Sequence, residues 1–156
     1  MENRILIAYY SWKGNTKRIA ELIQKQTGGD LFEIKPAEAY TIDYNALTKQ
    51  AKTEIRSGFL PELAQMPDTA PYTTIFLGTP NWWNTMAPPL ASFISECDTR
   101  SKTIIPFLTH GGGGSGTIEK DISAMCPQAV MKKGFAVYNR GGSDVADEIN
   151  DWLDKL

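Results

Sequence analysis

The sequence predicts an α/β fold, a doubly wound parallel sheet of five strands with helices on both faces. Short apolar runs alternate with helical patterns along the whole chain, which is typical of repeated strand–helix–strand units. Several runs are apolar at consecutive positions, as expected for parallel strands buried on both faces. The length of 156 residues suits one sizeable core, so we expect residues 1–156 to form a single domain.

The first half of the chain is predicted to contain two strands and two helices. The near-continuous apolar run Arg4–Tyr10 indicates the first strand. Apolar residues then recur at helical spacing over Asn15–Thr27, and the Gly28-Gly29 pair predicts the end of that helix. A short strand is expected at Leu31–Lys35, followed by a mostly polar helix over Asp43–Ser57 with its apolar residues on one side.

The second half continues the same alternation. Strands are expected at Thr73–Thr79, Thr103–Thr109 and Phe135–Asn139, because each is a short and mainly apolar run. The Pro88-Pro89 pair predicts the start of a helix, since proline fits a first helical turn. A further helix is expected after Thr103–Thr109, with Ile118, Ile122 and Met125 as its apolar residues.

Two details of the second half are specific enough to be checked. Pro106 lies inside a predicted strand and cannot donate a ladder hydrogen bond, so we expect a bulge or kink there. The last helix is predicted to begin at Ser143, whose hydroxyl can cap it. Asp144, Asp147 and Glu148 would then lie near the positive end of its dipole.

Net charge and cysteine content narrow the class of protein. A net charge of −2 gives no basic footprint for nucleic acid, and no apolar window is long enough to cross a bilayer. We therefore expect a cytoplasmic protein with no nucleic-acid and no membrane partner. Cys97 and Cys126 lie far apart in a chain with one histidine, which argues against a metal site or a redox thiol pair. We expect two buried or partly buried free thiols.

Three loops follow predicted strands at the edge where open parallel sheets bind ligands. The first is Ser11–Thr16, which offers hydroxyl and amide side chains and backbone N–H groups at the start of a helix, a favourable place for an anion. Gly14 lets this backbone curl inward. Taken alone, a plain turn with a helix cap explains the loop equally well.

The other two loops are rich in tryptophan or glycine. Thr79–Pro89 contains Trp82 and Trp83, whose flat rings suit stacking on a planar ligand, although one of them could instead plug the loop. Thr109–Gly116 contains four consecutive glycines, which suit a ligand that approaches the main chain closely; a flexible surface loop is the alternative. His110 has no acid or nucleophile beside it, so a structural role and a catalytic role both stay open.

Together, the three loops predict a site for a planar heterocycle with one terminal phosphate, and here the sequence resembles the flavodoxin-like proteins that bind FMN. Residues 11–16 read S-W-K-G-N-T, similar to the family pattern S-x-T-G-x-T. Residues 79–83 read T-P-N-W-W, similar to its P-N-W-W loop, and residues 109–116 resemble its T-x-G-G-x-G stretch. The likeness covers essentially the whole chain. It implies a flavodoxin-like fold with strand order 2-1-3-4-5 and FMN as the cofactor.

The resemblance implies a role for each loop, with no catalytic residue and no metal. The FMN phosphate would be held by Ser11, Lys13, Gly14, Asn15 and Thr16. The isoalloxazine would be lined by Thr79, Pro80, Asn81, Trp82, Trp83 and Asn84, with one tryptophan against a ring face. The pyrimidine side and the ribityl chain would meet Thr109, His110, Gly111, Gly112 and Gly113, mostly through backbone groups.

The chain departs from the electron-carrying flavodoxins in three respects. Lys13 replaces the usual threonine and adds a charge to the phosphate loop. The segment Asn81–Met86 has no glycine, although those carriers place one beside flavin N5. A non-glycine residue at positive φ there would cost about 1 kcal/mol or more. The net charge of −2 is also milder than the strong acidity of those carriers.

Three function classes follow from these features. We expect a small electron-transfer flavoprotein that docks on redox partner proteins, either a reductase or an acceptor. The alternative is an FMN-dependent NAD(P)H:quinone-type oxidoreductase that acts on a small quinone-like acceptor. Chain length favours the carrier, whereas the mild charge and the missing glycine favour the enzyme. A phosphate- or nucleotide-binding module without redox work would leave the tryptophan pair unexplained.

Overall fold

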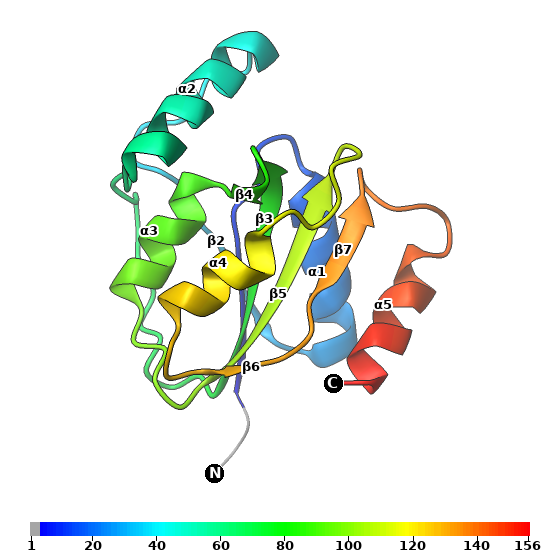
Figure 1. Ribbon diagram of the computed structural model, residues 1–156. Coiled ribbons are helices and arrows are strands. Elements are labelled where there is room, and N and C mark those ends of the chain that lie inside the picture. Colours follow the sequence, from blue (N-terminus) through cyan, green and yellow to red (C-terminus); the bar gives the residue numbers. More distant parts are fainter. Residues whose placement is uncertain (1–3) are drawn as a thin grey trace.

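A computed structural model describes residues 4–156, in which one sheet lies between two layers of helices (Figure 1). The strands are β1 (Ile5–Tyr9), β2 (Asp30–Glu33), β3 (Thr74–Trp82), β4 (Thr85–Met86), β5 (Thr103–His110), β6 (Val130–Met131) and β7 (Phe135–Tyr138). The helices are α1 (Asn15–Thr27), α2 (Tyr44–Ser57), α3 (Pro88–Glu96), α4 (Ile118–Met125) and α5 (Val145–Asp154).

The sheet confirms the predicted doubly wound α/β fold. Its main order is β2-β1-β3-β5-β6, and the pairs among β1, β2, β3 and β5 are parallel. β4 folds back on β3 as a short antiparallel hairpin, and β7 pairs with β5 beyond β6. With β6 and β7 taken as one interrupted edge strand, this order is the expected 2-1-3-4-5.

Pro106 marks the interruption of the edge strand, and the predicted bulge is wrong. β5 pairs with β3 residue for residue on both sides of Pro106. On its other side, β5 pairs with β6 near its start and with β7 near its end. A residue without an N–H is tolerated at this position because the edge strand is broken beside it.

Apolar side chains form one core on each face of the sheet. α1 and α5 cover one face, with Ile19, Ile23, Ile149 and Trp152 buried against the strands. α3 and α4 cover the other face, where Phe93 is wholly buried. The expected thiols agree with this packing: Cys126 is buried, Cys97 is partly buried, and burial raises the pKa of both.

The start of α5 differs from the prediction. The N-cap residue is Asp144, without a side-chain cap hydrogen bond, and Ser143 lies outside the helix. The prediction that the Ser143 hydroxyl caps the helix is therefore wrong. The Val145 N–H donates to the Gly142 carbonyl instead. The expected acidic residues Asp147 and Glu148 do lie in the first turn.

α2 stands apart from the two helix layers, beyond the edge at which the parallel strands end (Figure 1). Asp43 caps it through a 2.9 Å hydrogen bond from the Ala46 N–H, and only Leu47 and Ala51 are buried.

No helix in residues 4–156 has the length and apolar character to cross a bilayer. Within the same residues, no cluster of His, Cys, Asp or Glu is arranged to hold a metal ion.

Candidate functional site

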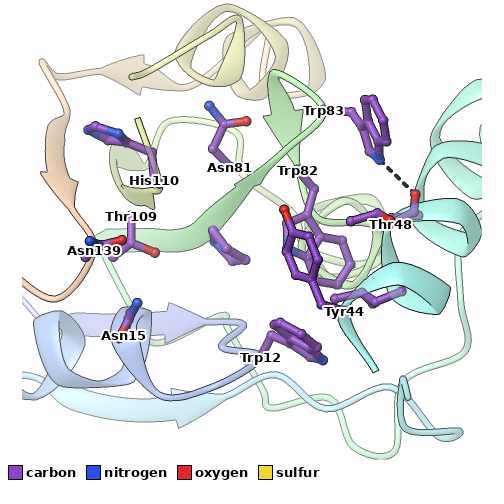
Figure 2. Close-up of a pocket in the computed structure, with 14 residues that line it drawn as sticks. Trp12, Asn15, Tyr44, Thr48, Asn81, Trp82, Trp83, Thr109, His110 and Asn139 are labelled. Atoms are coloured by element: carbon purple, nitrogen blue, oxygen red, sulfur yellow. Dashed lines mark hydrogen bonds between the residues drawn. The ribbon is translucent and has the colours of Figure 1, made fainter. Parts of the chain in front are cut away.

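A cavity of about 600 Å³ opens between α2 and the loops after β1, β3 and β5 (Figure 2). It is lined by Trp12, Asn15, Tyr44, Leu47, Thr48, Ala51, Pro80, Asn81, Trp82, Trp83, Thr109, His110, Gly111 and Asn139. The volume lies within the range of about 300–1,000 Å³ that is usual for small-molecule sites. The three loops singled out in the sequence therefore meet at one site.

One end of the cavity is formed by the start of α1. Gly14 has φ 102° and precedes the helix, and its N–H donates to the Ser11 hydroxyl at 3.0 Å. The first helical hydrogen bond runs from the Arg18 N–H to the Gly14 carbonyl. The N–H groups of Asn15, Thr16 and Lys17 thus have no partner within the helix, which leaves them free to bind an anion.

Two side chains of this loop have more specific positions. The Thr16 hydroxyl lies 2.9 Å from the Thr109 hydroxyl, and both residues are buried, so this hydrogen bond ties α1 to the end of β5. Lys13 is exposed, and its ammonium lies 4.5 Å from the centre of the Trp12 ring, within the range of a cation–π contact. Lys13 therefore sits at the rim, against an aromatic residue of the cavity.

The other end of the cavity is formed by the β3–β4 hairpin. Its two-residue turn is Trp83-Asn84, with φ values of 54° and 71°. Positive φ at both central residues is the mark of a type I′ turn, which normally contains glycine or asparagine. A bulky residue in this conformation costs about 1–2 kcal/mol. This conformation was not predicted from the sequence, because a segment without glycine argues against positive φ.

Hydrogen bonds from both sides hold this turn. The Asn81 side chain accepts from the Asn84 N–H at 2.9 Å and donates to the Gly114 carbonyl at 2.8 Å. The Asn84 carbonyl accepts from the Thr117 N–H at 2.7 Å. At Gly116, an added Cβ would lie 2.4 Å from the Asn84 carbonyl oxygen. The glycine loop thus packs against the hairpin too closely for a side chain at position 116.

A carboxylate in α4 anchors the same region from outside the cavity. Asp121 accepts hydrogen bonds from the Thr85 and Thr117 hydroxyls, each at 2.6 Å. These threonines belong to the hairpin and to the end of the glycine loop. Asp121 therefore joins the two segments that hold the turn.

The two adjacent tryptophans have different environments. Trp82 is only 9% exposed and meets the rings of Tyr10 and Tyr40 edge-on, at centroid distances of 5.5 and 5.2 Å. Trp83 is 52% exposed, and its indole N–H donates to the Thr48 carbonyl in α2 at 2.9 Å. Trp82 thus packs into the domain while it lines the cavity, and Trp83 forms part of the rim.

The tyrosines behind Trp82 stay neutral. Burial raises the pKa of Tyr10 and Tyr40 well above the ordinary value, and the carboxylate of Glu54 adds to both shifts. The Tyr40 hydroxyl donates to Glu54 at 2.5 Å. Both hydroxyls therefore stay protonated, and that of Tyr40 serves as a donor to Glu54.

His110 has a structural hydrogen bond at the cavity wall. Its Nδ1 accepts from the Gly112 N–H at 3.1 Å, and its ring meets Tyr138 edge-on at 5.8 Å. The His110 carbonyl accepts from the Asn139 N–H at 2.7 Å. These contacts shape the glycine loop and bring Asn139 to the cavity.

About half of the predicted site residues line the cavity. Those that do are Asn15, Pro80, Asn81, Trp82, Trp83, Thr109, His110 and Gly111. Those outside the lining are Ser11, Lys13, Gly14, Thr16, Thr79, Asn84, Gly112 and Gly113. Thr79 is wholly buried, where its hydroxyl donates to the Pro80 carbonyl and accepts from the Ala87 N–H. It stabilises the chain between β3 and α3.

Six lining residues were missed in the sequence: Trp12, Tyr44, Leu47, Thr48, Ala51 and Asn139. Trp12 lies inside the predicted phosphate loop, and its indole N–H donates to the Thr41 carbonyl at 3.0 Å. The four residues from α2 recur at helical spacing, so the pattern that predicted the helix also marked its inward face. Nothing in the sequence indicated that this face would meet the loops.

Known proteins of similar sequence and structure include flavoproteins. The sequence profile of the flavodoxin family matches residues 4–156. A candidate flavoprotein from Bacteroides eggerthii has a similar structure, with 30% identity, a TM-score of 0.87, and 99% of this chain and 98% of that chain covered. For a candidate flavoprotein from Bacteroides uniformis, the identity is 29%, the TM-score 0.88 and the coverage 99% of each chain.

A more distant neighbour shares the fold. It is a flavoprotein from Lactobacillus acidophilus in complex with FMN, with 24% identity and a TM-score of 0.77. The match covers 97% of this chain and 99% of that chain. No curated protein sequence matches the chain.

Proposed function

The chain belongs to the flavodoxin family, and we propose that its cavity binds FMN and that it works as a small electron-transfer flavoprotein. One observation carries the proposal: three loops far apart in sequence converge on a single cavity, with free helix N–H groups at one end and aromatic rings at the other (Figure 2). A ligand with one terminal phosphate and one planar ring system fits this set of groups. When bound, FMN would supply the redox chemistry.

Each region of the cavity would bind a different part of FMN. The N–H groups at the start of α1, with the Asn15 side chain, would hold the phosphate. Trp83 and Trp12 would offer ring faces to the isoalloxazine, while Trp82 closes the wall behind it. The backbone of Gly111 would meet the polar groups between these two ends.

An electron carrier needs a surface on which a partner can dock beside the flavin. Four large apolar residues near the cavity mouth are strongly exposed: Ile42 (85%), Tyr44 (65%), Trp83 (52%) and Tyr138 (61%). Exposed apolar surface of this kind is typical of protein interaction sites. We propose that redox partner proteins bind here.

We also propose that the protein works in the cytoplasm. The two free cysteines agree with the reducing conditions of that compartment.

The position of α2 favours a second candidate function. Leu47 and Ala51 of α2 give the cavity an apolar wall opposite the glycine loop. Such a wall suits a planar apolar acceptor held beside the flavin. An FMN-dependent NAD(P)H:quinone-type oxidoreductase is therefore the alternative.

The visible absorbance of the purified protein, followed by titration with FMN, tests the shared part of both functions. We expect a yellow protein, or a colourless one that takes up added FMN; failure to bind FMN would refute both. Photoreduction then separates them. Accumulation of a one-electron-reduced form supports the carrier, whereas direct two-electron reduction with rapid NAD(P)H oxidation by a quinone supports the enzyme.

A further inference from the structure

We propose that the mouth of the cavity is a docking surface for an acidic partner protein. The inference builds on the proposed FMN site and names the chemistry of its partner. Its basis is the distribution of charge around the exposed aromatic residues at the mouth. That distribution is opposite in sign to the net charge of −2.

Two lysines lie directly on tryptophans of the cavity. The Lys13 ammonium is 4.5 Å from the centre of the Trp12 ring, and the Lys52 ammonium is 4.9 Å from that of Trp83. One lysine comes from the loop after β1 and the other from α2, so they flank the mouth from two sides. Contact with the rings keeps both charges close to the opening.

Arginines add positive charge on a third side. The Arg18 guanidinium donates through Nε to the Arg140 carbonyl at 3.1 Å. Arg140 itself is exposed and directly follows Asn139, which lines the cavity. Both arginines therefore add positive charge to the side of the cavity on which Asn139 lies.

The nearest carboxylates accept hydrogen bonds within the protein, and Asp121 accepts from the Thr85 and Thr117 hydroxyls. None of the residues that line the cavity is acidic. Asp43 accepts the cap hydrogen bond of α2, and Glu54 accepts from the Tyr40 hydroxyl and the Gln50 amide. The largest group of exposed acidic residues lies at the N-cap of α5 and along this helix, which starts near the edge where the parallel strands end and runs away from that edge (Figure 1): Asp144, Asp147, Glu148, Asp151 and Asp154.

Exposed aromatic side chains with lysines against them fit an acidic protein surface. Tyrosine and tryptophan supply the buried centre of a typical interface, and the surrounding charges steer a partner of opposite sign. A nucleic acid also carries negative charge. It is the weaker candidate, because a net charge of −2 gives no basic footprint for nucleic acid.

Quenching of tryptophan fluorescence by iodide and by caesium measures the sign of the field at the mouth in the protein without flavin. Trp82 and Trp152 are only 9% and 8% exposed, so quenching by small ions reports mainly on Trp83 and Trp12. We expect the ratio of the iodide to the caesium quenching constant to fall by about twofold or more between about 0.01 and 1 M salt, as screening removes the positive field. A ratio that rises with salt, as a field set by the net charge would give, overturns the proposal.

Two double variants of equal net charge locate that field. Lys13→Gln with Lys52→Gln should remove most of the salt effect. Lys132→Gln with Lys133→Gln should keep it, because these exposed lysines follow β6 at the opposite end of β5. Equal behaviour of the two double variants would contradict a field that arises at the mouth.

Binding of two labelled probes of equal charge then tests the class of partner: a short glutamate-rich peptide and a single-stranded oligothymidylate. We expect the peptide to bind the FMN-loaded protein in low salt, and to bind several-fold more weakly to the Lys13 and Lys52 double variant than to the Lys132 and Lys133 one. Absence of peptide binding, or tighter binding of the oligonucleotide, overturns the proposal. Absorbance reports FMN loading separately, so a failure of the cofactor proposal is seen as such.

Discussion

The two ends of the cavity reach their backbone conformations in different ways. At the start of α1, the residue with positive φ is Gly14, and a single local hydrogen bond to Ser11 completes the turn. At the β3–β4 hairpin, the residues with positive φ are Trp83 and Asn84, which need contacts from distant segments. Glycine adopts such φ values without strain, whereas tryptophan does not.

This difference indicates where the site is sensitive to change. The α1 end depends on its own short loop and on the link from Thr16 to Thr109. The hairpin end depends on the glycine loop, about 30 residues further along the chain, and on Trp83 as its link to α2. We therefore expect the most damaging changes to be those that separate the hairpin from the glycine loop.

Gly116→Ala should have the largest effect. The new Cβ would lie 2.4 Å from the Asn84 carbonyl oxygen, and φ at this position is +51°. We expect a loss of about 3 kcal/mol in the free energy of unfolding, at the upper end for overpacked sites, measured by urea denaturation. Gly114→Ala is the matched control, since φ there is also positive, at +70°, and an added Cβ would meet nothing within 4 Å. Equal losses in the two variants would show that the close approach to the hairpin does not matter.

Thr16→Val tests the link at the α1 end. It leaves the buried Thr109 hydroxyl without its partner at 2.9 Å, so we expect a loss of about 2 kcal/mol in unfolding free energy. The double variant Thr16→Val with Thr109→Val should be more stable than the sum of the two single losses implies. Strict additivity in this double-mutant cycle would mean that the two hydroxyls do not interact.

Trp83→Ala should weaken FMN binding by about 1.5 kcal/mol, or roughly tenfold, within the range for aromatic stacking on a planar base. Trp83→Phe keeps an aromatic ring of smaller area and removes the N–H that donates to Thr48, so it should retain more of the affinity than Trp83→Ala. Flavin fluorescence titration measures both constants. An unchanged dissociation constant for Trp83→Ala would remove this residue from the flavin wall.

Lys13→Thr should have the smallest effect. Because the ammonium lies on the Trp12 ring at the rim, it offsets only part of the phosphate charge. We expect a loss of about 0.5 kcal/mol in FMN binding at low salt and a flatter salt dependence. Lys132→Thr, which lies after β6, serves as the control. Salt dependence unchanged by Lys13→Thr would mean that neutral groups alone bind the phosphate.

The sequence predicted most of the fold because its signals are local. Consecutive apolar residues marked β1, β3 and β5, and helical spacing marked the five helices. The rule that ligands bind beyond the carboxyl ends of parallel strands then placed three loops at one edge. The predictions that failed concerned local details that depend on residues nearby in the folded structure. The bulge expected at Pro106 is replaced by a break in the adjacent strand, and the Val145 N–H bonds the backbone where Ser143 was expected to cap.

The site was predicted less completely than the fold. Helical periodicity marked the inward face of α2, but not the surface that this face would meet. The hydrogen bonds from Trp83 to Thr48 and from Trp12 to Thr41 place α2 at the cavity. These contacts join residues 35 and 29 positions apart, and such pairings leave no local pattern in a sequence.

By itself, the sequence determined the α/β alternation, the three loops at one edge and the glycine at which α1 begins. Each of these depends on residues that are close together in the chain. Only the tertiary structure decided that Trp82 is packed inside while Trp83 stands at the rim, and that α2 closes the cavity. The positive φ of Trp83 opposes local preference. It persists because the Asn84 N–H donates to Asn81, Asn81 donates to the Gly114 carbonyl, and the Thr117 N–H donates to the Asn84 carbonyl once the whole chain has folded.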